Sequence, residues 1–580
     1  MTKMKKMIAL AIALVMVICT MNVGIFAATG DLSADTTITI TELDAGDTVN
    51  LYKVLEWVDS EGWRLTSDFD VAAIQGLDTI KALIDPQKGQ PVVEMTKHDL
   101  EEIAKVAKTV QPVNSDSNVV AAGETSYTYT TFDDKADPVV DRPGMYVALV
   151  EPAVAGVVYN PILISADYES KNSTNSISSS AMMGTSEDIA AHAVAKKKKV
   201  SGEKTETKIT NDIGDVYDFK IETTIPVFAG SYIDTYFTLT DTVGEYLKLV
   251  DGSLEIKDLD GNTVTPTTNT FAGGAQEFTL SWDDAYIKAL PMAQDIVITY
   301  QAELAITKEE AAELPNVQEE HNRIIIEFPN NPKDDNGKGA IKDETREYTF
   351  TIDGKLWGDS DWQTAEIVKV GLDNDGNPVE SMVNYDNGSE HAALNGAKFG
   401  LYTNEDDAKA GNENYYTNDA FDGTVETADG GLLHIPGLDV GTYYLKELTS
   451  PKGYIKDDDV HTIVIDAVFE ETDVTEYWNG TAWNASKQSD DDVEFTYTVT
   501  TLKSYTVTVD GNESKYEMTL SGPSISSVTP GDSSTEIVNT KGVELPATGG
   551  MGTTIFYVIG TILVLGAGIL LVTRRRMNMN

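Results

Sequence analysis

Residues 237–241 read Phe237-Thr238-Leu239-Thr240-Asp241, and this alternation of apolar and polar side chains decides the fold. Successive side chains of a β-strand point to opposite faces of a sheet, so a period of two predicts a strand with one buried face. Similar alternation, or a richness in β-branched and aromatic residues, recurs at Thr37–Ile40, Tyr127–Thr131, Phe278–Trp282, Tyr348–Ile352 and Phe495–Val499. Turn signals separate such stretches at Asp260-Gly261-Asn262, Asp353-Gly354, Asp375-Gly376-Asn377 and Asp510-Gly511. With helical patterning limited to short stretches such as Asp99–Lys108, the sequence predicts an all-β chain of tandem immunoglobulin-like β-sandwiches.

Composition excludes several classes of function. The chain has 580 residues, enough for three or four domains, and a formal net charge of −50, which repels phosphate backbones and argues against nucleic-acid binding. The six histidines are scattered without the spacing of metal ligands, so we expect no metal site and no cofactor. The single cysteine, Cys19, lies in the first apolar run, which leaves the rest of the chain without disulfides or a thiolate nucleophile.

The N-terminal 28 residues have the layout of a secretory signal peptide. Lys3, Lys5 and Lys6 precede an apolar core at Met7–Cys19, and small residues end the segment at Ala27-Ala28. The alternative is a first transmembrane anchor. We expect residues 1–28 to be removed during secretion.

The other end combines three features in a fixed order. Leu545-Pro546-Ala547-Thr548-Gly549 comes first, an uncharged run at residues 553–572 follows, and the tail at 573–580 is basic. At about 1.5 Å per helical residue the run is long enough to cross a hydrocarbon layer of about 30 Å, with the arginines on the cytoplasmic side. Together the three features resemble a Gram-positive sortase sorting signal. The resemblance implies that a sortase cuts between Thr548 and Gly549 and passes the Thr548 carbonyl to an amine.

Composition also suggests domain boundaries. The polar stretch at 170–180 and the Pro- and Asn-rich break at 329–338 divide the secreted part into regions of about 29–185, 186–345 and 346–541. The last region is large for one small sandwich, and insertions near 374–391 and 477–492 account for the excess.

Strand parity places unusual side chains on apolar faces. In the last region, residues two apart on a predicted strand share a face. The sets that combine apolar and polar side chains are Ile367 with Lys369, Tyr443 and Leu445 with Glu447, and Ile537 with Asn539. The middle region repeats the pattern with these sets: Val194, Lys196, Lys198, Val200; Phe237, Leu239, Asp241; Asn322, Ile324, Ile326, Phe328. Each region thus offers a lysine near its start, an acid in its middle and an asparagine near its end.

These residue types suit a self-catalysed crosslink. Burial lowers the pKa of a lysine, which then becomes a neutral nucleophile, and raises the pKa of an acid, which then holds a proton. The acid polarises the asparagine amide while the amine attacks, and ammonia leaves. Ordinary salt bridges at the edge of a core are the alternative interpretation of the same parity.

Four motifs resemble those of Gram-positive, sortase-assembled (LPXTG) pilins of the backbone type. Tyr443–Tyr454 (YYLKELTSPKGY) resembles the pilin E-box, and Gly396–Tyr402 resembles a strand motif of collagen-adhesin B-type (Cna-B) domains. Tyr159–Ser165 and Asn322–Pro332 resemble N-terminal and middle segments of pilin subunits. The resemblance implies a pilin-type N-terminal domain, an isopeptide-forming middle sandwich and a C-terminal Cna-B-type sandwich.

On that resemblance, Lys369 joins Asn539 with Glu447 as the acid, and Lys198 joins Asn322 with Asp241 as the acid. The lysine that attacks the Thr548 acyl-enzyme of the next subunit is assigned to Lys196, with Lys197 as the second candidate. The run Lys196–Lys199 leaves both choices open, including Lys198 against Lys199. The usual tyrosine–proline pair of the pilin motif is absent here, and the lysine run stands in its place.

The resulting hypothesis is a structural subunit of a covalent cell-surface pilus (fimbrium). Its expected partners are a sortase, identical subunits, peptidoglycan at the pilus base, minor pilins and host surface molecules, and its expected location is the cell wall after transient membrane retention. The alternative is a monomeric, wall-anchored adhesin. We expect no enzyme activity beyond self-crosslinking, because no catalytic triad or metal constellation emerges.

Overall fold

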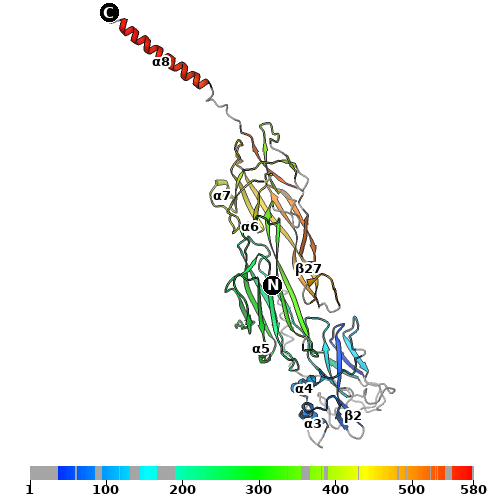
Figure 1. Cartoon of the computed structure of the whole chain (residues 1–580). Coiled ribbons are helices and arrows are strands. Elements are labelled where there is room, and N and C mark those ends of the chain that lie inside the picture. The colour runs from blue at the N-terminus through cyan, green and yellow to red at the C-terminus, as the bar shows by residue number, and fades with distance from the viewer. Residues whose placement is uncertain are drawn as a thin grey trace.

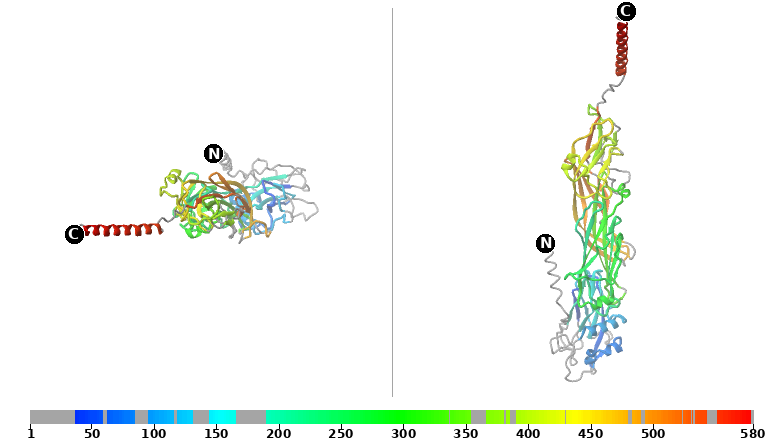
Figure 2. Two further views of the ribbon diagram at one scale, coloured as in Figure 1. Left: turned by 90° about the horizontal axis from the view of Figure 1, so that it is seen from above. Right: turned by 90° about the vertical axis from the view of Figure 1, so that its left-hand side faces the viewer.

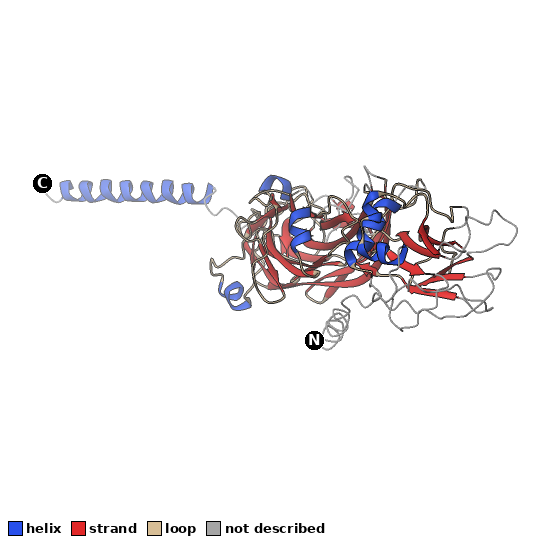
Figure 3. Cartoon of the chain, turned by 90° about the horizontal axis from the view of Figure 1, so that it is seen from below, coloured by secondary structure: helices blue, strands red, loops and turns tan. Residues whose placement is uncertain are grey.

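The computed structural model describes residues 37–58, 62–84, 95–115, 118–130, 144–165, 190–335, 337–353, 366–379, 382–384, 390–428, 430–479, 483–489, 493–522, 524–529, 531, 533–542 and 551–577. The expected signal peptide at 1–28, the polar stretch at 170–180 and the sorting motif at 545–549 lie outside these residues. Strand-rich regions follow one another along an elongated body (Figures 1 and 2). The expected all-β class is confirmed, and Figure 3 shows that helices form a minor part of this body.

The N-terminal region packs two sheets and a layer of short helices. One sheet has the order β4 (Ser126–Thr130), β1 (Thr37–Thr41), β8 (Ala190–Val194), and the other β3 (Gly62–Leu65), β2 (Thr48–Val58), β5 (Gly144–Glu151), β7 (Ile162–Ser165). Separate cores lie on the two faces of the second sheet. The helices are α2 (Ala72–Gln75), α3 (Asp78–Ile84) and α4 (Lys97–Ala107), the last of which covers the expected helix and starts at a capping box on Thr96.

The middle region is a two-sheet sandwich around one core. The first sheet has the order β10 (Gly202–Glu206), β11 (Val216–Ile225), β17 (Gln294–Leu304), β13 (Leu247–Leu249), with β14 (Glu255–Asp258) also on β17. The second has the order β15 (Thr268–Asn269), β16 (Glu277–Trp282), β12 (Phe237–Val243), β18 (Val317–Pro329), β19 (Lys338–Ile352), β25 (Ile435–Leu438). Two short helices, α5 (Asp284–Ala289) and α6 (Lys308–Ala311), lie in its connections.

The C-terminal region is a second sandwich. Its large sheet has the order β24 (Thr424–Glu426), β23 (Lys398–Tyr402), β26 (Gly441–Thr449), β27 (Val460–Trp478), β29 (Val493–Val509), β30 (Asn512–Ser521), β31 (Ser524–Thr529), with β28 (Trp483–Asn484) on β27. Opposite it lie the parallel pair β20 (Ile367–Leu372) and β32 (Thr535–Thr540). The hairpin of β21 (Met382–Asn384) and β22 (Glu390–Ala392) and the helix α7 (Glu405–Ala410) complete the region.

The strands β18 and β19 join the two sandwiches. One end of this strand pair contributes to the C-terminal core, with Val317, Tyr348, Phe350 and Ile352. The other end contributes to the middle core, with Ile324, Ile326 and Phe328. The boundary expected between residues 345 and 346 therefore falls inside β19, and the break expected at 329–338 is the turn between β18 and β19. A polar, Pro-rich turn and a domain linker have the same composition, so composition alone does not distinguish them.

The hairpin of β27 and β29 extends beyond its own sandwich. In Figure 1 it runs alongside the middle region. Lys342 of β19 contacts Glu476 of β27, and its Nζ donates to the Tyr497 hydroxyl of β29 at 2.9 Å. The expected insertion at 477–492 corresponds to the tip of this hairpin. Through the contacts of Lys342, the strands of the hairpin connect the two sandwiches.

Candidate functional site

Three inward-facing side chains and a tyrosine meet in the middle sandwich. We name Lys204, Asp241 and Asn322 the middle triad; they come from β10, β12 and β18 and are 4%, 0% and 0% exposed. The Lys204 Nζ contacts the Asp241 carboxylate and donates to the Asn322 Oδ1 at 2.5 Å. It also lies 2.7 Å from the hydroxyl of Tyr300 on β17, so both sheets supply the cluster.

Register brings these groups together. Lys204 is the only buried residue of β10. It is paired with Ile221 of β11, whose side chain is in the core. On the opposite sheet Asp241 is paired with Ile324, and Asn322 lies two residues before Ile324 on the same face. The amine of an edge strand therefore reaches across the core to the central strands of the facing sheet.

Burial shifts the pKa values of the middle triad toward the neutral forms. Desolvation lowers the pKa of Lys204 and raises the pKa of Asp241, while the opposite charge of each partner counteracts these shifts. The aromatic rings of Phe219 and Tyr300 lie 5.4 Å and 5.2 Å from the Lys204 Nζ and keep water away from it. An amine that can lose its proton thus faces an amide beside an acid that can hold one.

The structure corrects the lysine expected at this position. Lys198 lies on β9 (Lys197–Lys199), opposite Val158 of β6 (Val157–Tyr159), and not beside Asp241 and Asn322. The expected face does not exist, because β8 ends at Val194 and β9 begins at Lys197; Val194 is 61% exposed while Val200 is buried. Lys204 was missed because its neighbours two residues away, Gly202 and Glu206, carry no apolar signal.

The C-terminal sandwich holds a second cluster, which contains the residues expected from strand parity. We name Lys369, Glu447 and Asn539 the C-terminal triad; all three are 0% exposed, on β20, β26 and β32. The Lys369 Nζ lies 3.8 Å from the Glu447 Oε1, and the Asn539 Nδ2 donates to the Glu447 Oε2 at 2.9 Å. In the parallel pair β20–β32, Lys369 is paired with Ile537, so Asn539 is its diagonal neighbour on the same face.

Each member of this triad keeps one buried polar atom that is not used in a hydrogen bond. Within the described part of the chain, the Lys369 Nζ, the Glu447 Oε1 and the Asn539 Oδ1 have no hydrogen-bond partner. Burial lowers the pKa of Lys369 to about 8, although the Glu447 charge opposes the shift. Unpartnered buried polar atoms are costly, so their presence in both an amine and an amide points to a reaction between them.

The lysines expected to accept the next subunit lie where the N-terminal region meets the middle one. Lys196 and Lys199 are exposed, whereas Lys197 pairs with Asp44 at 2.8 Å between Nζ and Oδ1. Burial lowers the pKa of the half-buried Lys198, against the charge of Asp295. The position of Lys196 is fixed through its backbone, because its carbonyl accepts from the Asn160 amide at 3.2 Å.

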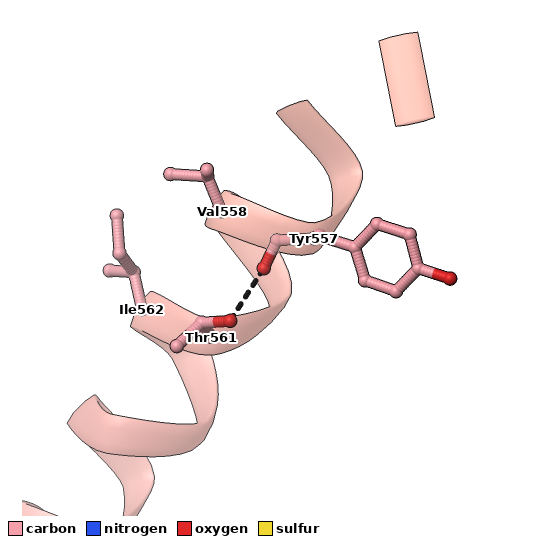
Figure 4. A pocket seen from close by; sticks show the side chains of 4 residues that line it. All are labelled: Tyr557, Val558, Thr561 and Ile562. Carbon is pink, nitrogen blue, oxygen red and sulfur yellow. Dashed lines mark hydrogen bonds between the residues drawn. The ribbon is translucent and has the colours of Figure 1, made fainter. Parts of the chain in front are cut away.

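The C-terminal helix α8 (Met551–Met577) has the composition of a membrane span. Within Ile555–Met577, an 18-residue stretch has a mean hydropathy of 2.6, and none of that stretch is buried in the protein. In Figure 4 the Thr561 hydroxyl donates to the Tyr557 carbonyl at 2.6 Å, so the helix itself satisfies this polar group. The groove drawn there lies along this one helix and is not a ligand site. Among the described residues no group of three or more His, Cys, Asp and Glu is arranged to hold a metal ion.

Comparisons with known proteins cover both the body and the tail. The profile of a family described as a prealbumin-like fold domain (SpaA) matches residues 383–478, and that of the LPXTG cell wall anchor motif matches residues 537–578. The trypsin-resistant surface T6 protein of Streptococcus pyogenes serotype M6 is 24% identical, with 94% of this chain and 96% of that protein aligned.

Solved structures give a similar result. The T6 backbone pilin of serotype M6 Streptococcus pyogenes, described as a modular three-domain structure, superposes with a TM-score of 0.50 at 18% identity, covering 89% of this chain and 100% of that one. The full-length major pilin SpaD of Corynebacterium diphtheriae has a TM-score of 0.39 at 17% identity, covering 74% and 91% of the two chains.

Proposed function

Because this chain is a sortase-assembled pilin subunit of the backbone type, we propose that its middle and C-terminal triads each form an intramolecular amide bond as the subunit folds. The chain is a subunit of a covalently polymerised pilus and is anchored to the cell wall. The single observation that supports these crosslinks is the burial of an amine, a carboxyl and a carboxamide together in each of two sandwiches.

The middle triad forms the bond between the Lys204 Nζ and the Asn322 Cγ. Asp241 takes a proton from the ammonium, and the neutral amine then attacks the carbonyl carbon, whose oxygen already accepts from Nζ. Asp241 returns the proton to the departing nitrogen and takes a second proton from Nζ, so that the Cγ–Nδ2 bond breaks, ammonia leaves and a secondary amide remains. Folding supplies the proximity, which can replace most of the barrier to an exchange between separate molecules.

The C-terminal triad forms the bond between the Lys369 Nζ and the Asn539 Cγ in the same way, with Glu447 as the acid. Here the pKa of Lys369, lowered to about 8 by burial, makes the neutral amine accessible near neutral pH. Each triad reacts once, so the chain modifies itself and has no turnover.

Polymerisation uses the exposed ends of the subunit. A sortase cleaves after Thr548 and transfers its carbonyl to an amine of the next subunit, for which Lys196 and Lys197 are the proposed acceptors. The exposure of Lys196 supports this assignment, because the acceptor must reach the sortase. Peptidoglycan at the base, minor pilins and host molecules remain proposed partners.

The crosslinks are tested by the intact mass of the secreted part, purified after folding. The mass should fall short of the sequence mass by two molecules of ammonia, and Asp241→Ala or Glu447→Ala should each restore one. Lys204→Ala should restore the loss at the middle triad, whereas the matched control Lys198→Ala should keep both losses. A full sequence mass for the unmutated, folded chain would refute both bonds.

A further inference from the structure

The segment between β26 and β27 touches two of the three groups of the C-terminal triad through its backbone. The Ile455 carbonyl accepts from the Asn539 Nδ2 at 2.5 Å. Two residues later, the Asp457 amide donates to the Glu447 Oε2 at 2.5 Å. The position of residues 455–457 therefore determines how the amide and the acid are oriented toward Lys369.

A histidine ties this segment to the body of the sandwich. His461, at the start of β27, is 8% exposed, and its Nε2 lies 3.1 Å from the Asp457 Oδ2. Its Nδ1 lies 2.7 Å from the Oδ2 of Asp510, in the turn between β29 and β30. The other oxygen of Asp510 accepts from the Thr462 amide at 2.8 Å, so this anchor is itself held by the sheet.

Each of the two ring nitrogens of His461 lies within hydrogen-bond distance of a carboxylate oxygen. A carboxylate only accepts hydrogen bonds, so any hydrogen bond in these contacts is donated by the ring. The His461 ring thus links Asp457 of the connecting segment to Asp510 of the sheet and fixes the direction in which the Asp457 side chain is held.

Among the described residues, no connecting segment donates a backbone amide to Asp241 of the middle triad, and a side chain takes that role instead. There the Tyr300 hydroxyl donates a hydrogen bond to the Asp241 carboxylate at 2.9 Å. In the C-terminal triad the corresponding donor, to the Glu447 carboxylate, is the Asp457 amide. A hydroxyl carried by a central strand needs no further support. A backbone amide in a connecting segment depends on the contacts that hold the segment, and His461 supplies one of them.

We propose that His461 is a positioning residue for the bond between Lys369 and Asn539, an inference that rests on the proposed function. Through Asp457 it keeps one oxygen of Glu447 occupied, so that the other faces the Lys369 Nζ at 3.8 Å. Through the same segment the Asn539 nitrogen is held by Ile455, which leaves the carbonyl open to attack. In the reaction the Nζ–Cγ bond forms and the Cγ–Nδ2 bond breaks, and the ammonium and carboxamide become a secondary amide and an ammonium ion.

The test measures both bonds in one chain. The secreted part is harvested as inclusion bodies, in which the chain has not folded and the bonds have not formed. It is dissolved in denaturant and then refolded by rapid dilution. Samples are quenched over time, and peptide mapping by mass spectrometry follows the joined Lys369–Asn539 and Lys204–Asn322 peptides separately. The middle triad is the internal control for refolding.

The expected result is an ordered loss of rate at the C-terminal triad alone. His461→Phe fills the space but donates nothing, and should slow that bond about tenfold to a hundredfold, the range for a small misplacement of reacting groups. His461→Gln keeps one donor and should be slowed less. The bond at the middle triad should form at the unmutated rate in both variants.

A second variant distinguishes positioning from simple loss of structure. Asp457→Asn keeps the backbone amide but removes the charge that His461 holds, so it should slow the bond as well, and the double variant with His461→Gln should be little slower than the slower single variant. Unchanged near-ultraviolet circular dichroism in these variants is part of the expected result.

Three outcomes would overturn the inference: an unmutated rate in His461→Phe, a faster bond in His461→Phe than in His461→Gln, or fully additive effects in the double variant. Failure of the unmutated chain to form the Lys369–Asn539 bond is a different result, which refutes the proposed crosslink itself.

Discussion

At the scale of single residues, the two triads reach similar chemistry with different neighbours. In each, a lysine beside an aromatic ring is buried together with an asparagine and an acid. The acid is Asp241 beside a tyrosine hydroxyl in one sandwich and Glu447 beside a backbone amide in the other. The longer glutamate side chain and the connecting segment together do what the aspartate and Tyr300 do in the middle sandwich.

Tyr300 gives the first prediction at this scale. Tyr300→Phe removes the hydroxyl that donates to Asp241 and accepts from the Asn322 Nδ2 at 2.7 Å, so the amide loses a partner that orients it. The Lys204–Asn322 bond should form more slowly on refolding, by about tenfold or more, and the Lys369–Asn539 bond should be unaffected. Peptide mapping of quenched samples measures both rates.

The matched control is Tyr217→Phe. Tyr217 is also buried in the middle core and packs on Phe219, but its hydroxyl contacts only the Tyr348 carbonyl, at 3.4 Å, among the hydrogen bonds of the described residues. An equal slowing in both variants would show that Tyr300 acts through core packing and not through its hydroxyl.

At the scale of the elements, the edge strand β10 carries the reactive lysine together with a perturbed acid. Burial raises the pKa of Glu206 to about 7, and the charge of Lys204 opposes this shift. Burial likewise raises the pKa of Asp343 on β19 to about 6. Once Lys204 becomes an amide its charge is gone, so crosslinking should raise both pKa values further.

These shifts predict a pH dependence of stability. Because the pKa of Glu206 is higher in the folded state, from an ordinary value of 4.5 to about 7, the folded state binds the extra proton. The stability that this provides is complete below 4.5 and is lost as the pH rises through about 7. Glu206→Gln should therefore match the unmutated chain in acid and become the more stable of the two above neutral pH.

Urea denaturation followed by the fluorescence of the buried Trp282 measures this difference at each pH. Glu203→Gln, on the same strand but exposed, is the control and should show no such trend. A constant difference between Glu206→Gln and the unmutated chain across the range would contradict the prediction.

At the scale of the whole molecule, the proposed bonds would decide which part of the chain carries tension. The reacting residues of the middle triad are 118 positions apart in the sequence, and β18 continues into the hairpin with β19 that joins the sandwiches. With the bond formed, force passes from Lys204 to Asn322 and bypasses residues 205–321. Extending that part would require breaking a covalent bond, a much larger barrier than a native stability of about 5–15 kcal/mol.

Assembly gives the prediction at this scale. Denaturing gels of cell-wall extracts should show a ladder of covalent polymers, and the ladder should be lost in the double variant Lys196→Ala, Lys197→Ala, since the acceptor amine is removed. Lys199→Ala, which alters another exposed lysine of the same run, should keep the ladder. A single band in the unmutated strain would favour the wall-anchored adhesin, and a ladder in the double variant would move the acceptor elsewhere.

The sequence by itself determined whatever depends on local periodicity. The alternation at 237–241 and 322–328 placed Asp241 and Asn322 on core-facing sides, and the same reasoning placed Lys369, Glu447 and Asn539. The reason is that side-chain direction along a strand has a period of two whatever the strand pairs with. The sorting tail depends on composition and order alone, and the comparisons confirm it.

Only the tertiary structure decided which distant groups meet. Lys204, Tyr300 and His461 come from strands whose register and facing sheet are not encoded in their neighbours, and the expected Lys198 failed because the strand it needed is interrupted between Val194 and Lys197. Likewise, β19 crosses two cores where composition suggested a boundary. Contacts between strands far apart in sequence depend on the packing of whole sheets, and that information exists only once the chain has folded.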